Sequence, residues 1–148
     1  LSLIGDSSGG TLAASVSLAA RDRNGPKISY QLLLYPALDT TCDYPSHHEF
    51  ARGYFLTTQN MGWFWRSYIS HEIEYTNPYA VPMRAQDLSN LPSTFIIIAE
   101  YDPLRDEAFA FAQRLIHAHV TTHVLVYPSC HCFMSFAHFL PIGNQAVK

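Results

Sequence analysis

Apolar residues follow two different spacings along this chain of 148 residues. Four short apolar runs predict strands, at residues 1–4, 28–35, 94–99 and 123–127. The run at 28–35 is rich in apolar residues on both faces, as a central strand of a parallel sheet is. Between these runs, apolar positions recur at helical spacing, which predicts helices over residues 8–22, 58–69, 105–119 and 133–140. Strands that alternate with helices predict an α/β fold with a parallel, doubly wound sheet, whose ligand sites lie outside the carboxyl ends of the strands.

Polar residues directly follow three of the predicted strands. Ser7 follows the first strand, Asp102 the third and His131 the fourth. Because the carboxyl ends of parallel strands meet at one edge of a sheet, we expect these three side chains to converge there.

Ser7 lies in the sequence GDSSGG at residues 5–10. A G-x-S-x-G pattern between a strand and a helix is typical of a nucleophilic serine, since the sharp turn lifts the hydroxyl above the sheet and leaves no room for side chains two residues before and after it. Only the frame centred on Ser7 fits, because Ser8 has Asp6 rather than Gly two residues before it. The backbone N–H of Ser8 is expected to donate to the oxyanion of the reaction.

Three other interpretations of GDSSGG compete with a nucleophile. A phosphate-binding loop would need a lysine before Thr11, where the chain has Gly10. A protease of the chymotrypsin type would surround the motif with strands and would not place an Ala-rich helix after it. A plain Gly-Ser turn that caps a helix stays open, although the flanking strand and helix are those that a nucleophile requires.

A nucleophilic serine needs a general base and an acid that orients the base. In this arrangement the acid and then the histidine follow the serine, each after a strand, and Asp102 and His131 satisfy that order. Asp39, after an earlier strand, is the alternative acid, and His138, in the last predicted helix, is the alternative base. His131 is favoured because, of the eight histidines, it alone lies in a loop at the exit of a strand.

Several other acidic residues and histidines are expected to have structural roles. Asp106 and Glu107 are expected to begin a helix and to interact with its dipole. His119 is expected to pack in the core, on the apolar stripe of that helix. Solvent exposure is expected for the histidines in the middle of the chain, which are His47, His48 and His71.

Composition limits the partners. Nine basic and twelve acidic side chains give a net charge of −3 without a basic cluster, so nucleic acid is not expected as a partner. No apolar run reaches the roughly 18 residues that span a bilayer, so stable membrane insertion is not expected. Three cysteines form no disulfide framework, which favours a cytoplasmic location. Cys130, His131 and Cys132 lack the fourth ligand of a structural zinc site, so no metal is expected.

Four segments of the chain carry a family resemblance: GDSSGG at 5–10, LLLYPALD at 32–39, DLSNLPSTFIIIAEYDPLRDEAFAFAQRL at 87–115 and HCFMSF at 131–136. Together they resemble the hormone-sensitive-lipase-like esterases of the α/β-hydrolase superfamily, a group that includes bacterial acetyl and short-chain carboxylesterases. The resemblance implies the α/β-hydrolase fold and a catalytic triad of Ser7, Asp102 and His131. It also implies hydrolysis of small, short-chain carboxylic esters through an acyl-enzyme, without a cofactor.

Two features depart from that family. Its members usually carry Gly after the histidine, where this chain has Cys132; if φ is positive there, a side chain costs about 1 kcal/mol or more. The chain also begins inside an apolar run, at Leu1, and contains no His-Gly-Gly-Gly oxyanion loop. We therefore expect residues 1–148 to be the carboxyl-terminal part of one catalytic domain, with the oxyanion loop, the cap and the first half of the sheet preceding it.

These departures leave a second function open, that of a catalytically inactive hydrolase-like module used for binding. The free edge of the first strand also leaves association into a homodimer open, because an unpaired strand edge can pair with another chain.

Overall fold

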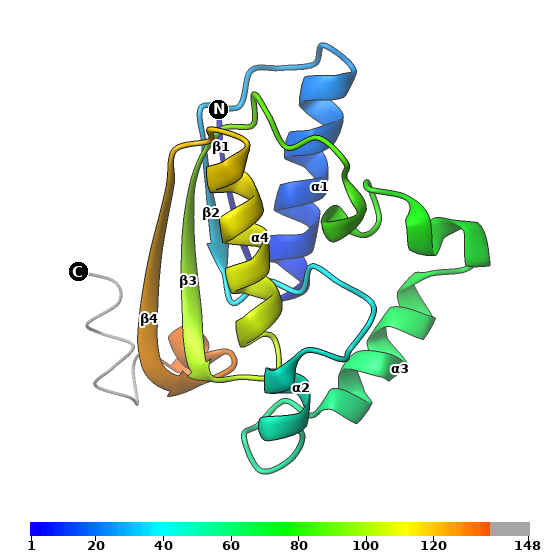
Figure 1. Ribbon diagram of the computed structural model, residues 1–148, viewed down its shortest axis with the longest axis vertical. Coiled ribbons are helices and arrows are strands. Elements are labelled where there is room, and N and C mark those ends of the chain that lie inside the picture. The colour runs from blue at the N-terminus through cyan, green and yellow to red at the C-terminus, as the bar shows by residue number, and fades with distance from the viewer. Residues whose placement is uncertain (137–148) are drawn as a thin grey trace.

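The computed structural model describes residues 1–136, in which strands and helices alternate (Figure 1). The strands are β1 (Ser2–Asp6), β2 (Tyr30–Leu34), β3 (Ser93–Tyr101) and β4 (Thr122–Cys130). The helices are α1 (Ser8–Asp22), α2 (Pro45–Glu49), α3 (Thr58–Tyr68) and α4 (Arg105–His117). Short 3-10 helices span Glu72–Thr76, Pro82–Arg84 and Phe133–Phe136. The sequence did not predict α2 or the 3-10 helices at 72–76 and 82–84, because they are too short for a periodic pattern.

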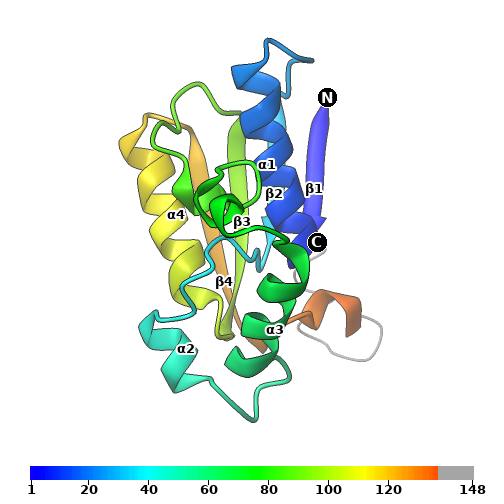
Figure 2. The ribbon, with the colours of Figure 1, turned by 90° about the vertical axis from the view of Figure 1, so that its right-hand side faces the viewer.

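All four strands are parallel and lie in the order β1-β2-β3-β4, which confirms the predicted parallel α/β sheet. Right-handed crossovers that add strands in one direction place their helices on one face of the sheet. Accordingly, α1 and α4 lie on the same face (Figures 1 and 2). Buried apolar side chains fill the space between these helices and the sheet, among them Ala14, Leu18, Leu33, Ile96, Ile98, Phe111 and Leu115.

The opposite face of the sheet carries a smaller apolar cluster. Strand partners in register share a face, so Leu125 lies on the same face as its β3 partner Ile97. Leu125 is 45% exposed there, whereas Ile97 is buried. The buried members of the cluster are Tyr35, Ile97, Ala99 and Phe133.

The last turn of α4 ends two residues earlier than predicted. His119 has φ 60° and donates its N–H to Ile116 O at 3.0 Å, and Val120 donates to Leu115 O at 3.0 Å. This pair of bonds ends a helix through a left-handed residue and buries the apolar residue that follows it. His119 is exposed as a result. The prediction that His119 packs in the core is therefore wrong.

Only part of the apolar stripe expected along α3 is buried. Met61 and Trp65 pack into a cluster with neighbours that include Ala37. Phe64 and Tyr68, from the same stripe, are each 48% exposed. In Figure 1, α3 extends away from the sheet. Its buried residues are Met61 and Trp65, so the helix packs along one side.

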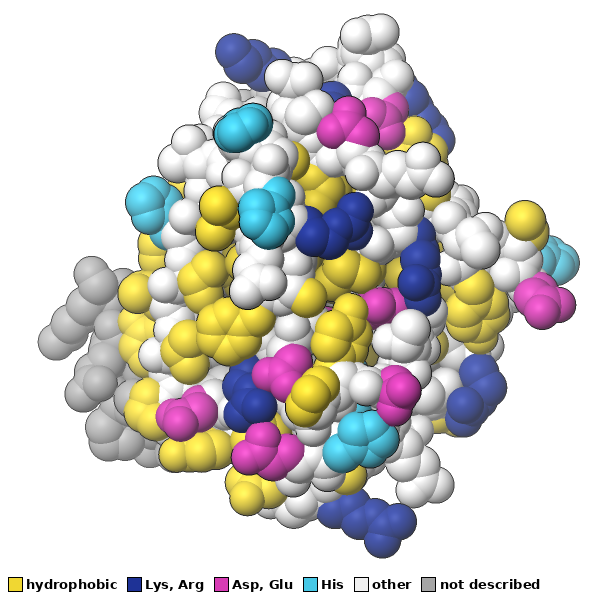
Figure 3. Space-filling model, viewed as in Figure 1, with side chains coloured by type: hydrophobic (Ala, Val, Ile, Leu, Met, Phe, Trp, Pro, Cys, Tyr) yellow, Lys and Arg dark blue, Asp and Glu magenta, His cyan; other side chains and the backbone are white. Residues whose placement is uncertain are grey.

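The surface shown in Figure 3 intersperses Lys and Arg side chains with Asp and Glu. None of the helices within residues 1–136 combines the length and the hydropathy that crossing a membrane requires. Of the predicted last helix, residues 133–136 form a 3-10 helix, and residues 137–140 lie outside the described residues.

Candidate active site

Ser7 occupies the tight turn between β1 and α1, with φ 51° and ψ −118°. Such a conformation costs about 1–3 kcal/mol for a residue with a side chain, and it persists only where the surrounding structure holds it. The N–H of Ser7 donates to Leu34 O at 2.9 Å. Its carbonyl accepts from the amides of Gly10 at 3.0 Å and Ala37 at 3.3 Å. The bonds to Leu34 and Ala37 tie the strained turn to the end of β2 and the segment after it, and the bond from Gly10 ties it to α1.

Two glycines of the motif are required by close contact. A Cβ on Gly5 would lie 2.0 Å from Gly9 O, and one on Gly10 would lie 2.6 Å from Pro36 Cβ. At Gly9 the nearest atom to such a Cβ would be Asp6 Oδ1, at an ordinary 3.6 Å. The prediction that side chains are excluded two residues before and after Ser7 is therefore confirmed at Gly5 and wrong at Gly9. The excluded space lies at Gly10, because this residue packs on the segment after β2.

The three side chains expected to converge do so. His131 Nδ1 lies 2.6 Å from Asp102 Oδ2, and His131 Nε2 lies 2.9 Å from Ser7 Oγ. Asp102 and His131 are only 1% and 2% exposed, so the hydrogen bond between them is shielded from bulk water, which strengthens it. The second oxygen of Asp102 accepts from the Leu104 amide at 2.9 Å, which orients the carboxylate.

The surroundings of His131 set its proton affinity. Burial lowers the pKa of His131, but the hydrogen bond to Asp102 and the adjacent Cys132 raise it by more, and the result is about 9. The Tyr35 ring packs edge-on against the imidazole, with centroids 5.0 Å apart. Cys132 has φ 61°, so the expected cost of a side chain at this position applies. His131 nevertheless contacts both of its partners.

The alternative acid is not part of this arrangement. Asp39 is buried, but its carboxylate accepts from Arg84 at 2.9 Å and from the Tyr44 hydroxyl at 3.0 Å. His138 lies outside the described residues. Within residues 1–136, no three His, Cys, Asp or Glu side chains come together in a group that could hold a metal ion.

Two buried titratable residues near the site were not anticipated. Glu107 Oε1 accepts from the amides of Leu38 and Asp39 at 2.6 and 3.2 Å, and His47 Nε2 lies 3.4 Å from Glu107 Oε2. Burial raises the pKa of Glu107 well above its usual range and lowers that of His47. The prediction of solvent exposure for His47 is therefore wrong. Glu107 lies in the first turn of α4, as predicted, but the sequence did not predict its burial or its hydrogen bonds to the two amides. The available signal was the position of Glu107 four residues before Phe111, on the buried side of α4.

Ser7 lines an open cavity of about 510 Å³. The amide of Ser8, at the start of α1, also borders it, and the helix supplies no carbonyl to that first amide. A ligand oxygen beside Ser7 can therefore accept from the Ser8 N–H. The apolar walls of the cavity come from the segment after β2, α1 and α3, through Ala37, Leu12, Met61, Phe64, Trp65 and Tyr68.

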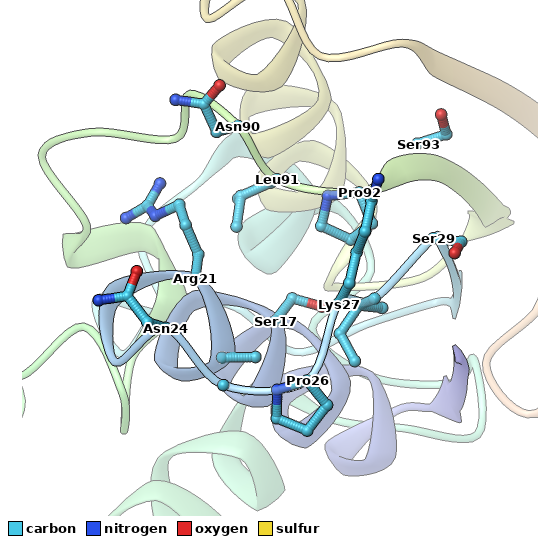
Figure 4. A pocket seen from close by; sticks show the side chains of 13 residues that line it. Ser17, Arg21, Asn24, Pro26, Lys27, Ser29, Asn90, Leu91, Pro92 and Ser93 are labelled. Carbon is cyan, nitrogen blue, oxygen red and sulfur yellow. The ribbon is translucent and has the colours of Figure 1, made fainter.

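A second cavity, of about 560 Å³, lies at the opposite end of the sheet (Figure 4). The end of α1, the loop that follows it and the start of β3 line this cavity, with Arg21, Lys27 and Asn90 among its polar residues. Arg21 is already engaged, because its guanidinium donates to Asp87 O and Ser89 O at 3.0 and 2.8 Å. The cavity shares no lining residue with the one beside Ser7.

Known proteins share this fold and much of this sequence. A family model described as the alpha/beta hydrolase fold matches residues 1–135. The chain is 36% identical over 151 residues to the esterase LipI of Mycobacterium tuberculosis, covering 100% of this chain and 47% of that protein. It is 34% identical over 151 residues to the ethyl acetate hydrolase of Pseudomonas putida, covering 99% and 47%. The solved structure of a hyperthermophilic esterase from the archaeon Pyrobaculum calidifontis superposes with a TM-score of 0.93 at 41% identity, covering 99% of this chain and 49% of that one.

The chain spans about half the length of the curated relatives it matches, in their carboxyl-terminal portion. The parallel sheet and the serine turn after β1 agree with the family match. The chain therefore belongs to the α/β-hydrolase fold family, in its hormone-sensitive-lipase-like branch.

Proposed function

We propose that the whole protein is a carboxylesterase in which Ser7 attacks the ester carbonyl, His131 acts as the general base and Asp102 orients His131. The observation that carries this proposal is the unbroken hydrogen-bonded path from Asp102 through His131 to Ser7, with distances of 2.6 and 2.9 Å. The names of two relatives, an esterase and an ethyl acetate hydrolase, support the same reaction class.

The proposed mechanism gives each proton a place. In neutral His131, the hydrogen bond to Asp102 keeps the proton on Nδ1, so the Nε2 lone pair faces Ser7 Oγ. Nε2 takes the serine proton as Oγ attacks, and the imidazolium then protonates the leaving alcohol. Water then enters, gives a proton to Nε2 and attacks the acyl carbonyl. The imidazolium returns this proton to Ser7 Oγ as the acyl–serine bond breaks and the acid leaves. Asp102 stays ionised and stabilises the imidazolium in both halves of the reaction.

The Ser8 amide is the oxyanion donor that this chain supplies. It begins α1, where the helix dipole also favours negative charge. One such donor contributes about 2.7–4 kcal/mol of transition-state stabilisation. Since the chain spans about half the length of its relatives, we propose that further oxyanion donors come from segments of the whole protein outside these 148 residues.

The cavity beside Ser7 supports an uncharged substrate. Among residues 1–136, none of those that line it is charged, and Leu12, Phe64 and Tyr68 give it apolar walls. We place the apolar part of the ester against these walls, and we propose small-molecule esters with short acyl chains as the substrate class.

Two adjacent serines provide the test. In the whole protein, Ser7→Ala should lower kcat for p-nitrophenyl acetate by about 10⁶-fold, the loss typical of removing a serine nucleophile. Ser8→Ala should retain most of the activity, because only its backbone N–H takes part. The reverse result would move the nucleophile to Ser8 and overturn the assignment.

A binding module without catalysis is the second candidate, because Cys132 places a side chain at a left-handed position next to His131. The enzyme is favoured because His131 keeps hydrogen bonds to both Asp102 and Ser7.

A further inference from the structure

Glu107 joins two segments of the site that are far apart in sequence. Its side chain is fully buried, and Oε1 accepts from the amides of Leu38 and Asp39. Glu107 belongs to the first turn of α4, which begins directly after the Asp102 loop. A buried carboxyl group is costly unless hydrogen bonds satisfy it. The folded state is therefore more stable while Glu107 keeps its bonds to these two amides. Glu107 therefore sets the position of residues 37–39 relative to the Asp102 loop.

Residues 37–39 in turn hold the nucleophile turn. The Ala37 amide donates to Ser7 O at 3.3 Å, and the buried Thr11 hydroxyl donates to Ala37 O. Because the strained φ of Ser7 depends on such contacts, a shift of residues 37–39 would displace both the Ser7 hydroxyl and the Ser8 amide.

His47 covers the second oxygen of the carboxylate. Its Nε2 lies 3.4 Å from Glu107 Oε2, and both side chains are 0% exposed. Within residues 1–136, neither the ring nitrogens of His47 nor Glu107 Oε2 has a hydrogen-bond partner, so the 3.4 Å contact brings together two otherwise unpartnered buried polar groups. The neighbouring Ser46 fixes this placement, because its hydroxyl donates to Pro103 O at 2.6 Å and accepts from the Asp106 amide at 3.1 Å.

We propose that Glu107, supported by His47, is a positioning residue that aligns Ser7 with His131. This inference rests on the proposed ester hydrolysis at Ser7. Glu107 does not line the cavity beside Ser7, so it acts through residues 37–39 and not through the substrate. Loss of its carboxyl group should therefore lower kcat and leave KM nearly unchanged, because the transition state depends on the alignment of Ser7 and His131 whereas substrate binding depends on the cavity.

The test compares Glu107→Leu with Glu107→Gln in the whole protein, using p-nitrophenyl acetate. Active sites are titrated with a fluorophosphonate, so that kcat refers to folded sites alone. Glu107→Leu should lower kcat about 100-fold, the effect of a displacement of about 1 Å at the reacting atoms. Glu107→Gln keeps an oxygen acceptor for both amides and offers an N–H to His47, so its kcat should stay within about threefold. Glu49→Gln is the matched control, since Glu49 is exposed and pairs with Arg105, and it should change nothing.

His47→Leu provides a second variant if Glu107→Leu does not fold. It removes the imidazole that lies 3.4 Å from Glu107 Oε2 and removes no contact of Ser7, and its kcat should fall about tenfold. An unchanged kcat per active site in the folded variant, or a loss confined to KM, would overturn the positioning role. A loss in Glu107→Gln as large as that in the apolar variants would also overturn it. If the unsubstituted protein neither hydrolyses esters nor reacts with the fluorophosphonate at Ser7, the proposed function fails, and the positioning role fails with it.

Discussion

Gly5 and Gly9 offer a matched pair of substitutions that tests the geometry of the nucleophile turn. In Gly5→Ala the new Cβ would start 2.0 Å from Gly9 O, and an ordinary contact needs 3.4 Å or more. The end of β1 and the first turn of α1 must therefore move apart by roughly an ångström. A displacement of that size at a catalytic group costs about 100-fold in rate. Overpacking of this kind also costs about 1–3 kcal/mol of stability.

Gly9→Ala should behave in the opposite way. Among the described residues, the new Cβ meets Asp6 Oδ1 alone, at 3.6 Å, and Gly9 lies within α1. Replacing a helical glycine by alanine gains about 0.5–1 kcal/mol. In a protein about twice the length of this chain, as its relatives are, such a gain corresponds to a rise in Tm of roughly 1 °C.

The two variants are compared by kcat on p-nitrophenyl acetate and by Tm from calorimetry, in the whole protein. We expect Gly5→Ala to lose activity and stability and Gly9→Ala to lose neither. Equal losses in the two variants, or an active and stable Gly5→Ala, would refute the contact argument.

Further predictions concern the residues around the base. His131 acts as a base only when neutral, and its pKa is about 9, so kcat/KM should rise with pH and level off above about 9; a plateau already reached near pH 7 would contradict the raised pKa. The same raised pKa stabilises the fold in full below about pH 6.5, and this contribution is lost as the pH rises through about 9, which thermal melts across that window should record. Asp102→Asn should lower kcat about 10⁴-fold, whereas Asp39→Asn should leave kcat per titrated active site largely intact, and similar losses would show that the acid is misassigned. Cys132→Gly relieves a left-handed strain of about 1–2 kcal/mol but gains unfolded-state entropy, so its free energy of unfolding in urea should stay within about 1 kcal/mol. The β-branched Cys132→Val should lose more than 1 kcal/mol, on the order expected for a forced left-handed residue.

The convergence of Ser7, Asp102 and His131 was predictable because it depends on local order along the chain. Each residue follows a strand, and parallel strands bring their carboxyl ends to one edge of the sheet. The apolar runs that identify those strands are continuous and short, so their type and order are readable from the sequence. The hydrogen bonds at 2.6 and 2.9 Å agree with that reasoning.

The predictions that were wrong concern contacts between distant segments, which no local sequence pattern encodes. His47 is buried because α2 docks on the loop after Asp102, and a helix this short has no apolar period to reveal the docking. Phe64 and Tyr68 have the spacing of core residues, yet they line the cavity beside Ser7 because α3 packs along one side only. His119 follows the helical spacing of α4, but the turn that ends the helix directs it to solvent.

The most direct test of the account is the site and rate of labelling by a fluorophosphonate, mapped by mass spectrometry in the whole protein. A phosphonyl adduct on Ser7 that forms rapidly, is absent from Ser7→Ala and slows by orders of magnitude in His131→Ala is the predicted result. A label on another residue, or an unchanged rate in His131→Ala, would contradict a serine activated by its hydrogen bond to His131.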